Sequence, residues 1–79
     1  MKRYTIHTKW DGSGGTYLAT FDTFAEVLAY TQAVYDVNSD TAGLAVKIID
    51  NEKKDDVYDG PLNPIILAGL RYNYEKGLI

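Results

Sequence analysis

The chain has 79 residues and no cysteine, so it holds one domain with no disulfide and no thiolate metal site. Its hydrophobic fraction of 46% and its two prolines exclude a disordered chain, and its formal charge of −3 is too small for wholesale imitation of duplex DNA. No apolar run approaches the roughly 20 residues of a membrane span. We therefore expect a single cytoplasmic domain over residues 1–79.

The first predicted element is a hairpin over residues 3–21. Side chains in its first strand alternate between an apolar and a basic face, and this period of two is typical of a half-buried strand. The glycine-rich run 11–15 predicts the turn, and residues 16–21 predict the returning strand. The side chains expected to face the core are Ile6, Trp10, Tyr17, Ala19 and Phe21.

A capping box predicts that a helix starts at residue 24. Thr23 and Glu26 have the spacing in which each side chain accepts a hydrogen bond from the backbone N–H of the other residue. The helix is expected to end near residues 36–38 and to bury one stripe of side chains. The stripe consists of Phe24, Val27, Leu28, Thr31, Val34 and Tyr35. The opposite side carries the small residues Ala25, Ala29 and Ala33.

The second half of the chain predicts two more strands and a helix. Residues 44–50 are apolar on both faces and predict a central strand, while residues 56–59 predict a short edge strand after a polar tip. Asn63 and Pro64 predict the start of a helix over residues 64–76, which Gly77 terminates. Its buried side chains are expected to be Ile66, Leu67, Leu70 and Tyr74.

The predicted order β-β-α-β-β-α indicates an α+β fold with a small antiparallel sheet. The first helix is expected to cover one face of the sheet. The short terminal helix either closes the end of the domain or packs against another chain.

The sequence has few side chains that could act in catalysis. His7 is the only imidazole, and it lies on the predicted exposed face with no partner to orient it as a general base. The glycine run 11–15 joins two strands instead of opening a helix, so it does not predict a phosphate loop. The acidic run after residue 50 lacks the glycine and the distal glutamate of a calcium loop. We predict no catalytic residue, no metal and no cofactor.

Contact residues, in contrast, are plentiful, since seven of the residues are tyrosines. Tyr17, Tyr35 and Tyr74 are expected in the core, whereas three other tyrosines fall on or near outer faces. The acidic run is either a solvated turn or a patch that is presented to a basic groove. The predicted partner-binding residues are Asp50, Glu52, Asp55, Asp56, Tyr58, Asp59, Tyr30 and Tyr72.

Two alternatives remain open at the level of sequence. The first is a small nucleic-acid-binding regulator that uses Arg3, His7 and Lys9 on the basic face of the first strand. The second is an accessory subunit that forms homo-oligomers through the alanine face of the first helix or through the terminal helix.

The layout of the chain resembles that of small acidic proteins encoded by phages and mobile elements, including anti-CRISPR and other host-takeover inhibitors. The likeness lies in the opening strand at residues 2–6, the turn 11–15, the strand-to-helix joint 21–26 and the strand 45–50 before an acidic tip. The resemblance implies a non-enzymatic inhibitor in the bacterial cytoplasm that occupies a surface of a host protein or ribonucleoprotein complex. It implies no site residues.

Overall fold

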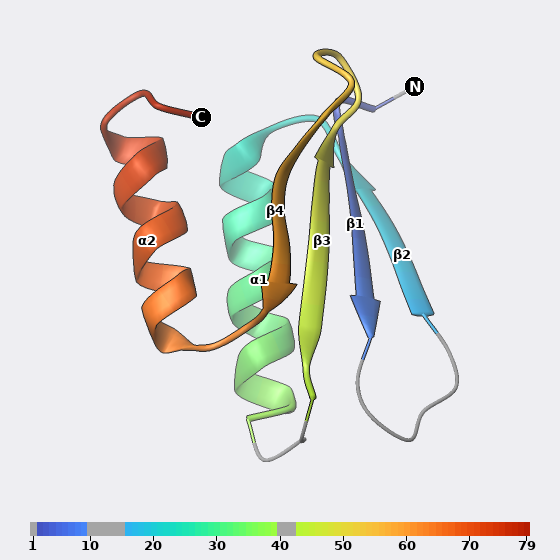
Figure 1. Cartoon of the computed structure of the whole chain (residues 1–79), viewed down its shortest axis with the longest axis vertical. Helices are drawn as coiled ribbons and strands as arrows, with labels where there is room; N and C mark the ends of the chain where they lie inside the picture. Colours follow the sequence, from blue (N-terminus) through green and yellow to red (C-terminus); the bar gives the residue numbers. More distant parts are fainter. Residues whose placement is uncertain (1, 10–15, 40–42) are drawn as a thin grey trace.

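The computed structural model describes residues 2–9, 16–39 and 43–79. Its elements follow one another as β1 (Tyr4–Lys9), β2 (Thr16–Phe21), α1 (Phe24–Val37), β3 (Ala45–Asp50), β4 (Asp55–Pro61) and α2 (Pro64–Glu75) (Figure 1). The predicted α+β fold and its element order are confirmed. Trp10 and the turn 11–15 lie outside the described residues.

The four strands form one antiparallel sheet in the order β2-β1-β3-β4. The prediction that residues 44–50 form a central strand and that the next strand lies at an edge is confirmed. Both helices lie on the same face of the sheet, with α2 beside α1 and next to β4 (Figure 1).

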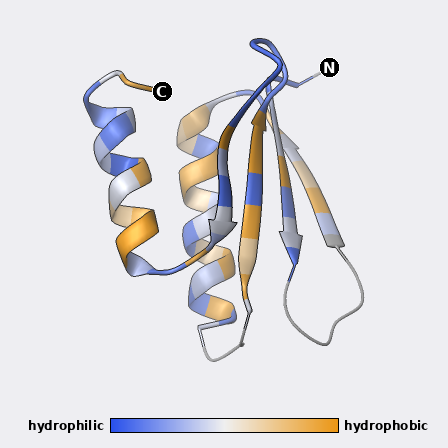
Figure 2. Cartoon of the chain, viewed as in Figure 1, coloured by the Kyte–Doolittle hydropathy of each residue, from blue (hydrophilic) through white to orange (hydrophobic). Residues whose placement is uncertain are grey.

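Alternation along the central strands builds the core. On β1 the buried residues are Tyr4, Ile6 and Thr8, and on β3 they include Val46 and Ile48. Apart from the polar Thr8, these side chains meet the buried stripes of α1 and α2 in one hydrophobic cluster. Hydrophobic residues accordingly mark β3 and α1 in Figure 2, whereas the turn between β3 and β4 is hydrophilic.

Both helices begin where the predicted caps lie. The Thr23 hydroxyl accepts from the Glu26 N–H at 3.3 Å, and the Glu26 carboxylate accepts from the Thr23 N–H at 3.1 Å. In α2 the Asn63 side chain accepts from the Ile66 N–H at 3.0 Å, and proline occupies the first turn. After α2, Gly77 has the positive φ of 74° that favours glycine at a helix end.

The terminal helix packs against its own chain. Leu67 and Leu70 of α2 are buried, and the ring of Tyr74 stacks on that of Phe24 in α1 with the centroids 5.7 Å apart. The helix therefore packs within its own chain, and its use in contacts with another chain stays a prediction. Ala25, Ala29 and Ala33 of α1 are exposed.

The prediction that Tyr17 belongs to the core is wrong, because its side chain is 63% exposed. Its register is as expected, since it lies opposite Thr8 on the inward face of the sheet. However, β2 is an edge strand, and the end at which Tyr17 lies diverges from α1 (Figure 1). Facing inward therefore does not bury this ring. The prediction that Tyr74 is buried is also wrong, because its side chain is 39% exposed. It lies near the C-terminal end of α2, where its ring stacks on Phe24 and is otherwise little covered.

Candidate functional site

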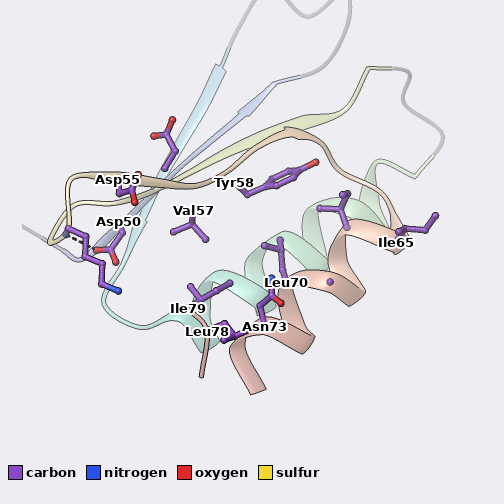
Figure 3. Close-up of a pocket in the computed structure, with 13 residues that line it drawn as sticks. Asp50, Asp55, Val57, Tyr58, Ile65, Leu70, Asn73, Leu78 and Ile79 are labelled. Atoms are coloured by element: carbon purple, nitrogen blue, oxygen red, sulfur yellow. Dashed lines mark hydrogen bonds between the residues drawn. The ribbon is translucent and has the colours of Figure 1, made fainter. Parts of the chain in front are cut away.

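A groove of about 600 Å³ separates β4 from α2 (Figure 3). It exists because α2 packs chiefly on α1 and leaves a space between itself and the edge strand. Its walls come from β4, α2, the turn after β3 and the last two residues of the chain. The volume is within the range of about 300–1,000 Å³ that is usual for ligand sites.

The groove has a polar end and an apolar end. Asp50 and Asp55 lie at the polar end, near the turn between β3 and β4, and Lys53 also lines this region (Figure 3). Tyr58 and Ile65 lie toward the apolar end, and Val57 lies between the two ends (Figure 3). A ligand that fits both ends therefore combines a charged group with apolar ones.

Asp50 is a structural residue of the polar end. Only 4% exposed, it accepts hydrogen bonds from the Arg3 guanidinium at 3.3 and 3.1 Å and from the backbone N–H groups of Glu52 and Lys53 at 3.1 and 3.3 Å. The bond from Arg3 holds the pKa of Asp50 below its ordinary value of 3.8, and the backbone bonds lower it further against the opposing effect of burial. This carboxylate ties Arg3, the residue before β1, to the turn after β3.

The remaining acids of the predicted set are exposed. Asp55 lies opposite Asp50, whereas Asp56 and Asp59 lie opposite Ile49 and Lys47 on the outer face of the sheet. The register shift leaves the residue between Asp56 and Tyr58 as the extra member of a β-bulge. Asp56 also contacts the Lys47 amine at 3.9 Å, an exposed ion pair that contributes little to stability.

Tyr58 is half-buried in the wall of the groove. Its hydroxyl donates to the backbone carbonyl of Pro61, and burial raises the pKa of the phenol above its ordinary value of 10.0. The ring lies along the strand over Gly60, where a Cβ atom would come within 2.9 Å of the hydroxyl. The absence of a side chain at Gly60 thus permits this position of the ring.

The predicted partner-binding residues do not form one surface. Asp50, Asp55, Asp56 and Tyr58 line the groove. The ring of Tyr30 instead packs against Phe21 at 5.1 Å. The other three, Glu52, Asp59 and Tyr72, are exposed but do not line the groove.

Several residues that line the groove were not predicted from the sequence. Ile65 and Leu78 are 81% and 70% exposed, although both are large and apolar. Gly69 lies in the middle of α2, where glycine costs about 1 kcal/mol relative to alanine. A glycine inside a predicted helix is the signal that would have pointed to this wall.

The residues of the nucleic-acid alternative are partly separated. His7 and Lys9 line a shallow hollow on the open face of the sheet together with Lys47 and Asp59. Arg3, in contrast, is engaged with Asp50. Nucleic-acid binding by this face stays a prediction, with Lys47 as an added cation and Asp59 as an opposing charge.

Within the described ranges, no three histidine, aspartate or glutamate side chains gather as metal ligands would. In the same part of the chain, neither helix has the length and apolar character needed to cross a membrane. No family model, curated protein or solved structure matches the chain.

Proposed function

We propose that this chain is a non-enzymatic binding protein of phage or mobile-element type, which inhibits a host defence or nucleic-acid-processing complex by occupying one of its basic surfaces. The observation that supports this proposal is the groove beside β4, which is lined by acids and by exposed apolar side chains. A surface that combines charged and apolar side chains is suited to contact with a partner protein.

Charge supports a basic partner. Asp55, Asp56 and Asp59 project from both sides of one edge strand, and Glu52 is exposed on the adjoining turn. Lys53 and Lys54 on the same turn, and Lys47 beside Asp56, offset part of this negative charge. The acidic charge that remains along the strand favours the approach of a cationic surface. A groove that normally holds a nucleic-acid strand carries such cations.

The paired substitution Asp55→Lys with Asp56→Lys is expected to weaken partner binding at least about tenfold while the fold is retained. Both side chains are exposed, so their replacement leaves the core intact, and the repulsion lowers the association rate. The measurement is affinity capture from bacterial lysate, followed by surface plasmon resonance on the captured partner. Circular dichroism checks the fold of each variant.

Asp36→Lys with Glu75→Lys is the matched control. It changes the net charge equally, but it acts near the C-terminal ends of α1 and α2, where a cation is favourable, and outside the groove. The control is expected to bind nearly as the parent does. Failure to capture any stoichiometric protein, or equal losses in the two paired variants, would contradict the proposal.

A further inference from the structure

We propose that the groove between β4 and α2 binds an extended segment of the partner, which adds as a strand to the edge of β4 and carries a Lys or Arg beside large apolar residues. This inference rests on the proposed function and specifies the chemistry that its contact site recognises.

The first observation concerns the edge of the sheet. Among the described residues β4 pairs with β3 alone, so its other side presents backbone N–H and C=O groups outward. The groove opens between this strand and α2. An extended peptide that pairs with an edge strand places alternate side chains into such a neighbouring groove.

The second observation is Gly69 on the opposite wall. It is exposed, it lines the groove, and it does not have the positive φ that calls for glycine. A Cβ atom added there would meet no atom within 4 Å, so close packing does not require glycine either. The fold therefore gains nothing from this residue, whereas a bound segment gains room to approach the helix.

The charged residues of the groove indicate what kind of segment it binds. Asp50 is already paired with Arg3, and Asp56 contacts Lys47 on the outer face of the sheet. Asp55 remains exposed at the groove, where one lysine lines the same end. A second copy of this chain would bring its own acids against the same edge, and like charges opposite each other are unfavourable. A segment with a Lys or Arg complements the acids, while its apolar side chains cover Val57 and Ile65.

The position of the two ends gives the expected order of residues in the segment. The strand runs from the acidic end at Asp55 toward Tyr58. Because of the β-bulge, these two residues lie opposite Asp50 and Ile48, which are two positions apart on β3, so the path is roughly 7 Å at about 3.3 Å per residue. Antiparallel pairing is the commoner arrangement and would place the basic residue on the C-terminal side of the segment. We expect a large apolar residue followed two positions later by Lys or Arg, because side chains two positions apart on a strand lie on the same face.

The experiment is selection of random peptides displayed on phage against the purified chain. Peptides with this order are expected to be enriched, and a synthetic enriched peptide is expected to shift the amide signals of β4 and of α2 in NMR titration. Methylating alternate backbone nitrogens of the peptide should abolish binding, because it removes the strand-pairing donors.

Gly69→Ala is expected to raise the midpoint of thermal unfolding by about 2–8 °C and yet weaken peptide binding. Gly69→Leu is expected to weaken peptide binding at least about tenfold. Ala68→Leu enlarges the neighbouring helix position, which lines the hollow between the two helices instead of the groove, and it is expected to leave binding unchanged.

Several outcomes would overturn the inference: no enriched peptide, enriched peptides without Lys or Arg, NMR shifts confined to other surfaces, or full binding by Gly69→Leu. If Gly69→Leu still captures a stoichiometric partner from lysate in a charge-dependent manner, the groove inference fails while the proposed function stands. If selected peptides bind the groove but lysate yields no partner, the proposed function fails instead.

Discussion

Asp50→Asn is expected to lower the free energy of unfolding by about 2–3 kcal/mol at neutral pH. The carboxylate accepts two hydrogen bonds from Arg3 and one from each of two turn amides, and the amide group of asparagine cannot replace this charged acceptor. Urea denaturation followed by circular dichroism measures the change. The N–H groups around the turn should also exchange faster with solvent.

Glu52→Gln is the control for this prediction. Glu52 also faces Arg3, at 3.8 Å, but its side chain is 69% exposed, so its removal is expected to change stability by less than about 0.5 kcal/mol. Equal effects of the two substitutions would contradict the structural role assigned to Asp50.

The interaction between Asp50 and Arg3 makes the stability of the fold depend on pH. The folded-state pKa of Asp50 is lowered, mainly by Arg3, from an ordinary value of 3.8. Its stabilising contribution is therefore fully present above about pH 4–5 and is lost as the pH falls below 3.8 through the folded-state pKa. The stability curves of the parent and of Asp50→Asn should converge in acid. Curves that stay parallel down to about pH 2 would contradict this linkage.

Leu70→Ala is expected to cost about 3 kcal/mol of stability. Leu70 is buried in the core cluster and also lines the groove, so its truncation leaves a cavity at the place where α2 is held to the rest of the domain. Urea denaturation measures the loss, and hydrogen exchange should show α2 losing protection before the sheet does.

Tyr72→Ala provides the comparison on the same helix. The Tyr72 ring is exposed, with the Lys76 amine 5.7 Å from its centroid, and its removal is expected to change stability by less than about 0.5 kcal/mol. A Leu70→Ala variant as stable as Tyr72→Ala would show that α2 is held by other contacts.

Local signals in the sequence predicted most of the fold. The capping box of Thr23 and Glu26 and the Asn63–Pro64 start of α2 act over three residues, so their effect is visible without knowledge of distant contacts. Alternation in β1 and β3 likewise identified the buried face of the two central strands.

Features of the candidate site depend on residues far apart in the chain. Arg3, the hydrogen-bond partner of Asp50, is 47 positions away in the chain. The sequence predicted Asp50 to be a contact residue of the acidic run, whereas its carboxylate stabilises the turn after β3. The exposure of Tyr17 depends on how far α1 extends over β2. Neither the role of Asp50 nor the exposure of Tyr17 can be predicted from neighbouring residues in the sequence.

The sequence by itself determined the order of the elements, their caps and the inward faces of the central strands, because these follow from hydrogen bonds and periodicities within a few residues. Tertiary structure decided where α2 docks, and thereby the groove, the exposure of Ile65 and the setting of Gly69. The physical reason is that burial is shared among elements from the whole chain, and it fixes their spacing only when all of them pack together.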